Sequence, residues 1–212
     1  SLLGESVLCP PVSPDMMSWM KKLFVIIILS LWFIIPSKAD DIRDFQISGI
    51  SLGDSLLSFF SKEFIQQTLK DKTKSYYYKD KKYADLILST LKKEEPYDFL
   101  QITIKPSEKL FYVHSIAGQI NFQDNMLKCQ KEKEIIVSDI KNLFSKKNFE
   151  TFFKPHAIDK SGKSKVDQSN LLLANGIIQV ECYDWSKKFP YSDKLIVSIK
   201  NLKFRDFLMN AY

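Results

Sequence analysis

The sequence predicts an α+β protein with one antiparallel sheet of about five to seven strands, two longer helices on one face and a short C-terminal helix. Three observations support this fold class. Apolar and polar residues alternate over several short runs, as in strands of a half-exposed sheet. Two longer segments repeat apolar residues at helical spacing, and turn-forming residues separate these segments.

The beginning of the chain has the pattern of an export signal. Lys21 and Lys22 precede an apolar run at 23–35, and the segment ends with small residues up to Ala39. The run is shorter than the roughly 20 residues that cross a bilayer as a helix, which favours a cleaved signal over an uncleaved anchor. We expect cleavage between Ala39 and Asp40. The mature protein is then periplasmic or secreted, and it meets the membrane only transiently through this signal.

The same pattern divides the chain into three parts. Residues 1–15 carry no initiator methionine and are interpreted as an upstream extension, and residues 16–39 form the signal peptide. Residues 40–212 are long enough for a single α+β domain with its own core. Three candidate start residues remain open, which are Met16, Met17 and Met20.

Composition argues against several function classes. The net charge of +6 comes mainly from lysines that alternate with acids, which is typical of a solvated surface rather than a nucleic-acid groove. No histidine, cysteine or carboxylate cluster has metal-ligand spacing. The stretch at 162–164 resembles the end of a phosphate-binding loop, but the first glycine of that motif is replaced by Ala157. We therefore expect no nucleic acid, metal or other cofactor.

The first elements after the signal are a short strand and a helix. Phe45 and Ile47 alternate with polar neighbours, which favours a strand. Ser51 and Asp54 have capping-box spacing, and apolar residues then recur at helical spacing, so a helix is predicted over 52–70. Its aromatic stripe is expected to face the core.

A segment rich in lysine and tyrosine follows at 72–95. The charged residues 79–82 predict a turn between two strands, although 83–91 fits a helix equally well. The tyrosines suit either a stacking platform for sugars or single-stranded nucleic acid, or aromatic pairing across strands. Pairing across strands is the favoured interpretation.

Two alternating runs, at 100–104 and 112–122, predict an antiparallel hairpin. His114 lies within the second run, where a hydrogen-bonded strand histidine is favoured over a catalytic base. A second helix is predicted at 126–144, after a cap at Asp124 or Asn125.

The two cysteines of the mature chain are predicted to form a disulfide. Cys129 falls in the first turn of the second helix on its apolar side, and Cys182 falls on the apolar face of a later strand. In an oxidising compartment such a pair is usually bridged, and the closed loop is worth about 4 kcal/mol. The alternative is two buried free thiols.

The last elements are strands and a short helix. Asn175-Gly176 between apolar runs predicts a hairpin with a type I′ turn. Tyr183 and Trp185 share the face opposite Cys182, where they form either a carbohydrate-type platform or a partly covered outer face. A strand at 195–199 and a helix at 204–208 follow, and this helix is expected to cover an edge or end of the sheet.

One catalytic constellation can be assembled from the sequence. His156 and Asp159 fall on one loop with Ser161 nearby, and a His–Asp pair is a candidate acid–base unit of a small hydrolase. No serine stands in the G-x-S-x-G motif of serine hydrolases.

The opening of the mature chain carries a resemblance. The segment Ile47-Ser48-Gly49-Ile50-Ser51-Leu52-Gly53-Asp54-Ser55 resembles an I-x-G-I-x-L-G-x-S signature of small uncharacterised bacterial exported proteins, and the sequences at 115–120, Cys129 and 182–185 are similar to that group. That group has no assigned activity. More loosely, a glycine pair before a helix and a meander resembles the BamE/SmpA-type envelope domains, although the lipid-attachment cysteine of those proteins is missing.

These observations predict a soluble exported domain of the cell envelope that binds rather than catalyses. Its expected partner is another protein, an envelope component or a small ligand, and the oligomeric state is not specified by the sequence. The alternative is a small hydrolase that uses His156 and Asp159.

Overall fold

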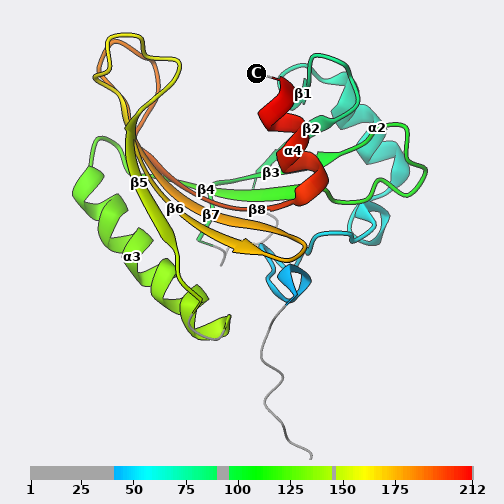
Figure 1. The fold of residues 1–212 in the computed structure, drawn as a ribbon. Coiled ribbons are helices and arrows are strands. Elements are labelled where there is room, and N and C mark those ends of the chain that lie inside the picture. The colour runs from blue at the N-terminus through cyan, green and yellow to red at the C-terminus, as the bar shows by residue number, and fades with distance from the viewer. Residues whose placement is uncertain (1–40, 90–95, 145–146, 212) are drawn as a thin grey trace, which may run out of the picture. The chain divides into compact units, whose positions relative to one another are not determined.

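Eight strands form one antiparallel sheet in the computed structural model, which describes residues 41–89, 96–144 and 147–211. Neighbouring strands follow the order β1-β2-β3-β4-β8-β7-β6-β5 (Figure 1). The α+β class is confirmed, whereas the expected five to seven strands are too few. The strands are β1 Ser75–Tyr77, β2 Ala84–Ser89, β3 Phe99–Ile104, β4 Ser115–Asn121, β5 Glu150–Pro155, β6 Lys165–Leu173, β7 Gly176–Asp184 and β8 Lys194–Asn201.

The predicted extension, signal peptide and cleavage site, at 1–15, 16–39 and Ala39–Asp40, lie outside the described residues. Within the described ranges, no helix combines the length and the apolar character that crossing a membrane requires.

The sheet consists of two four-stranded meanders, each preceded by a helix. Helix α2 (Lys62–Lys70) leads into β1 to β4, and helix α3 (Met126–Leu143) leads into β5 to β8. The meanders join where β4 pairs with β8, in a register that sets Ser115 opposite Lys200. Strand β8 is therefore an inner strand, although it is the last strand in sequence.

One face of the sheet carries the apolar core. Val180 of β7 pairs with Val197 of β8, and both belong to the buried core cluster with residues of α3. The Sγ atoms of Cys129 on α3 and Cys182 on β7 lie 2.07 Å apart, which is the bonding distance of a disulfide, as predicted. Helix α3 is thus fixed on the core face by both packing and a covalent bridge.

Helix α4 (Leu202–Ala211) partly covers the opposite face of the sheet, as Figure 1 shows. This face carries polar side chains. Because side chains alternate along a strand, Gln179 and Glu181 of β7 point away from the core side chains Val180 and Cys182. The predicted C-terminal helix therefore forms, but it lies over a face of the sheet rather than at its edge or end.

The predicted first long helix is mostly not helical. Only 62–70 forms α2, after a 3-10 turn, η2 (Leu56–Ser58). The expected capping box does not start a helix, because Ser51 Oγ donates to Arg43 O instead of accepting from the backbone. Leu56 N donates to Phe111 O, 3.1 Å away, so this part of the chain pairs with the loop before β4.

Other predicted elements are found with changes. The expected strand at Phe45 and Ile47 is reduced to an isolated bridge between Ile47 and Ile50. The lysine-rich segment forms β1, a turn and β2, so the helical alternative for 83–91 is wrong over 84–89. Helix α3 begins after Asn125, whose side chain caps Lys128 N at 3.0 Å.

The predicted hairpin between β6 and β7 forms, but its turn consists of Ala174 and Asn175 rather than Asn175 and Gly176. Gly176 is the first residue of β7 and pairs with Leu173. A Cβ atom at Gly176 would lie 2.4 Å from the carbonyl oxygen of Lys200 and 2.7 Å from the Ile42 side chain. The glycine therefore permits close packing between backbones, not a left-handed turn.

Candidate functional site

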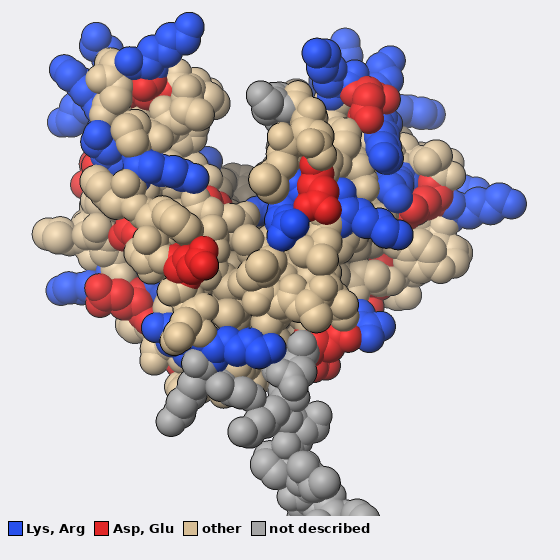
Figure 2. Space-filling model, in the orientation of Figure 1, with Lys and Arg blue, Asp and Glu red and all other residues tan. Residues whose placement is uncertain are grey.

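A groove lies on the polar face, between α4 and strands β5 to β8. It joins two hollows of about 510 Å³ and 520 Å³ that share Asn170, Ile177, Arg205 and Met209 in their walls. Figure 2 shows the surface hollowed beside α4. Each hollow is within the size range of small-molecule sites.

A chain of hydrogen bonds forms the floor of this groove. Lys200 Nζ donates to Gln179 Oε1 and, at 2.9 Å, to Ser198 Oγ. Gln179 Nε2 in turn donates to Asn170 Oδ1 at 2.9 Å, and Gln168 Nε2 donates to the same oxygen at 2.7 Å. The lysine thus fixes the orientation of the amides that follow it.

Lys200 is the central charge of the groove. Burial lowers the pKa of its ammonium, and Glu181 and Asp85 oppose that shift through longer-range attraction. Within the described part of the chain, its Nζ meets only neutral oxygens and forms no ion pair. A desolvated cation without an acidic partner is unfavourable in the free protein, and an anion placed beside it would supply the missing charged partner.

Two further cations line the same groove. Lys154 of β5 is exposed, and Arg205 of α4 pairs with Asp206 Oδ1 at 2.7 Å. The remaining wall includes Asn148 and the acid Glu150 in the larger hollow and is otherwise apolar. The apolar side chains of the other hollow are Phe152, Ile177, Leu208 and Met209.

Helix α4 is positioned by its N-terminus and by one aromatic anchor. Asn201 Oδ1 accepts from Phe204 N at 2.8 Å, which caps the helix. Asn201 Nδ2 also contacts His114 Nδ1 at 2.9 Å, and His114 Nε2 contacts Glu108 Oε2 at 3.0 Å. His114 therefore has the hydrogen-bonded structural position that the sequence favoured.

The anchor is Phe204, which is 1% exposed. Its ring packs 4.9 Å from the Tyr83 ring and 5.5 Å from the Tyr78 ring, between centroids. Tyr78 and Tyr83 thus pack against aromatic residues of α4, in a cluster of their own. This packing leaves the other side of α4, with Leu208 and Met209, toward the groove.

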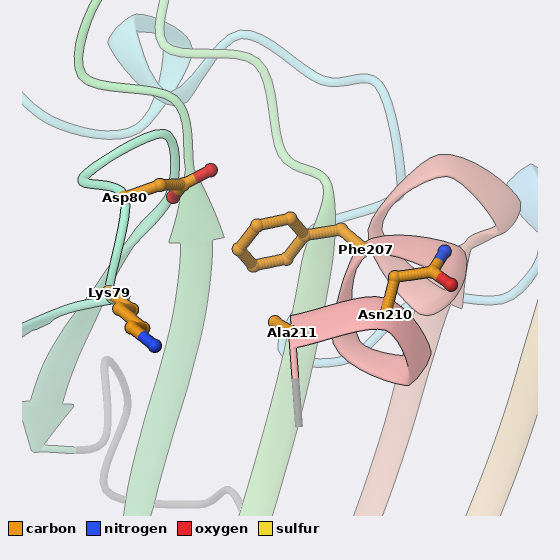
Figure 3. Close-up of a pocket in the computed structure, with 5 residues that line it drawn as sticks. All are labelled: Lys79, Asp80, Phe207, Asn210 and Ala211. Carbon is orange, nitrogen blue, oxygen red and sulfur yellow. The ribbon is translucent and has the colours of Figure 1, made fainter.

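A separate hollow of about 500 Å³ lies on the far side of the anchor, between α4 and the β1–β2 turn. In Figure 3 the Phe207 ring points from α4 toward Lys79 and Asp80 of that turn. The hollow contains one lysine, but that lysine and the aspartate both belong to an exposed turn. It lacks the half-buried cation, Lys200, of the groove beside β7.

All four site residues singled out from the sequence lie near one another, away from the groove. The ring centroid of His156 is 4.3 Å from that of Trp185 and 5.5 Å from that of Tyr183. Asp159 N donates to His156 O at 3.0 Å. They gather at one end of the sheet, where the β5–β6 and β7–β8 loops meet.

The Asp159 carboxylate accepts its hydrogen bonds from residues of its own loop. Its oxygens accept from Ser161 Oγ at 2.6 Å and from Ser164 N and Oγ at 2.8 Å, and these bonds lower its pKa. The His156 ring accepts from Ile158 N through Nδ1 at 3.2 Å. Among the described residues, no hydrogen bond joins the His156 ring to this carboxylate, so the geometry gives no support to a catalytic pair.

Tyr183 and Trp185 form part of a packed aromatic group rather than an open platform. Their rings stack with centroids 6.1 Å apart, and Tyr191 lies 4.7 Å from Trp185. Burial, with Glu181 beside it, raises the pKa of the Tyr183 hydroxyl. Trp185 Nε1 is buried without a hydrogen-bond partner among the described residues.

The residues of the groove were missed from the sequence. Lys200, Gln179, Asn170 and Gln168 stand at alternate positions of three strands, and only the pairing of those strands brings them together. The sequence does show amide side chains and a lysine alternating with apolar residues along these strands, and this pattern could have indicated a polar face.

The sequence predicted no metal site. Within the described ranges, no group of three or more histidine, cysteine or acidic side chains is arranged to hold a metal ion. Comparison with protein-family models, curated proteins and solved structures finds no match for this chain. Function is therefore inferred from the geometry of the groove.

Proposed function

We propose that this chain is an exported, non-enzymatic binding domain whose groove beside α4 takes a small amphipathic anion. The observation that carries the proposal is the ammonium of Lys200, which is desolvated and meets only neutral oxygens. A carboxylate, phosphate or sulfonate head group placed there gives this cation the charged partner that it lacks.

The other walls define the rest of the ligand. Phe152, Leu208 and Met209 offer apolar surface next to the cation, and Met209 is 75% exposed. Burying such surface stabilises a complex by about 25 cal/mol per Å². A ligand with an acidic head and a flexible apolar body, such as a long-chain carboxylate, matches both features.

Export is part of the same proposal. A cleaved signal at 16–39 and a Cys129–Cys182 disulfide are consistent with each other, because disulfides persist in oxidising compartments outside the cytosol. The protein would then meet its ligand in the periplasm or outside the cell. A protein partner or another envelope component is the alternative to this small ligand.

Calorimetric titration with dodecanoate tests the proposal. We expect saturable binding of one ligand per chain, and weak or no binding of dodecanol, which has the same apolar body without the charge. Lys200→Met should weaken dodecanoate binding by about tenfold to a hundredfold, the loss expected for one charge-assisted hydrogen bond.

The matched control is Lys203→Met, which removes the same charge. Lys203 is exposed on α4 and lines neither hollow of the groove. We expect the affinity of this variant for dodecanoate to equal that of the native protein. Equal losses in both variants, or equal binding of the acid and the alcohol, would refute the proposal.

A further inference from the structure

The β5–β6 loop (156–164) and the β7–β8 loop (185–193) form one unit at the same end of the sheet (Figure 1). Ser186 N donates to Ser164 Oγ at 3.0 Å, and the His156 ring packs on Trp185. We call these two loops the tip. Because these contacts join the loops, their exposed side chains are presented together.

The exposed charge of the tip is predominantly positive. Its two acids, Asp159 and Asp193, are only 6% and 4% exposed, and both accept hydrogen bonds within the tip. The lysines, by contrast, are exposed and have no hydrogen bond or ion pair from their side chains in the described part of the chain. Figure 2 shows lysines gathered over these loops. The four lysines are Lys160, Lys163, Lys187 and Lys188.

Apolar side chains stand among these lysines. Ile158 is 65% exposed and Tyr191 is 51% exposed, each in a different loop of the tip. Pro190 is exposed beside Tyr191. Aliphatic and aromatic side chains exposed beside lysines can enter the interface of a bilayer while the cations meet its head groups.

We propose that the tip docks on a bilayer that contains anionic phospholipids. The lysines supply attraction to the negative surface, and Ile158 and Tyr191 enter the boundary between head groups and acyl chains. The packing of Trp185 and the turn around Asp159 hold both loops in place before contact. This surface is distinct from the groove beside α4 and does not depend on it.

Sedimentation with lipid vesicles tests the proposal. The native protein should bind vesicles of phosphatidylcholine with phosphatidylglycerol more tightly than vesicles of phosphatidylcholine alone, and added salt should weaken that binding. Replacing the four tip lysines by glutamine should weaken binding about tenfold or more. A control that replaces Lys62, Lys70, Lys131 and Lys141, which are exposed on α2 and α3, removes the same charge and should bind nearly as well as the native protein.

Two single variants distinguish docking on a bilayer from attraction to any polyanion and from binding in the groove. Ile158→Gln should weaken vesicle binding several-fold, whereas attraction to a polyanion would not depend on this residue. Lys200→Met should leave vesicle binding unchanged, even if it abolishes dodecanoate binding, so the groove and the tip are tested separately. The proposal is overturned if the native protein does not prefer anionic vesicles, if the control lysines matter as much as those of the tip, or if Ile158→Gln has no effect.

Discussion

Lys200 occupies a costly position for a cation, on an inner strand beneath α4. Its pKa is lowered by burial, and neutral oxygens of Gln179 and Ser198 are its hydrogen-bond partners. Replacing a buried charged group by an apolar side chain of similar volume is often neutral or stabilising, which makes such a residue a candidate for a functional role. The cost of burying the Lys200 charge in the free protein is therefore the physical basis of the proposed ligand site.

The stability of the Lys200→Met variant follows from this position of the charge. Without ligand at neutral pH, its free energy of unfolding should equal that of the native protein or exceed it by about 1 kcal/mol, because a desolvated charge is removed and water can reach the half-buried Gln179. Urea denaturation monitored by circular dichroism measures the difference. A loss of more than about 2 kcal/mol would mean that the lysine is a structural residue, as for other broken buried networks.

Some residue-level predictions depended only on local sequence and were confirmed. Cys129 and Cys182 were matched because both fell on apolar faces, and of the two predicted caps, Asp124 and Asn125, the structure has Asn125. Lys200 could not be found in this way, since its partner Gln179 lies on a strand paired to it only in the folded sheet. The hydrogen bonds of the loop that follows β5 could not be predicted from spacing either.

At the level of elements, α3 and α4 pack on opposite faces of the sheet and are attached there by different interactions. The disulfide and core residues such as Ile140 attach α3, whereas α4 is attached by the Asn201 cap and the Phe204 anchor. A covalent bridge between an early helix and a late strand closes a long loop, with a separation of 53 residues. The bridge therefore contributes chiefly by restricting the unfolded chain.

Removal of this bridge should be clearly measurable. The double variant Cys129→Ala/Cys182→Ala should lose about 4 kcal/mol, which corresponds to a melting temperature lower by roughly 10 °C for a domain of this size. Scanning calorimetry gives the shift. Reductant should lower the melting temperature of the native protein and leave that of the double variant unchanged.

Free thiols in the protein collected after export would contradict the predicted role of the bridge, and so would equal melting temperatures of the native protein and the double variant. The second result would show that packing of α3 alone fixes the helix on the sheet.

For the whole molecule, the sequence indicated the α+β class and most strands but not their order. Hairpins such as β6–β7 are local and are indicated by alternation around a turn. The β4–β8 pairing joins residues far apart in sequence, so no local pattern specifies it. The prediction of one long helix over 52–70 was wrong because a contact distant in sequence decides the structure there. The first part of this segment pairs with the loop around Phe111.

The groove is a consequence of that order. Strand β8 ends the second meander and leads directly into α4, so the helix folds back over the polar face that β7 and β8 share. The cation on β8 and the apolar side chains on α4 are thereby brought to one site. Binding of an amphipathic anion at this site is the function that we propose.

The most direct test is a titration of ¹⁵N-labelled protein with dodecanoate, followed by two-dimensional NMR. We expect saturable shifts at the backbone amides of β6, β7, β8 and α4, centred on Gln179 and Lys200, with the loops at 156–164 and 185–193 unaffected. Shifts confined to those loops, or no saturable shift at the groove, would contradict binding at this site.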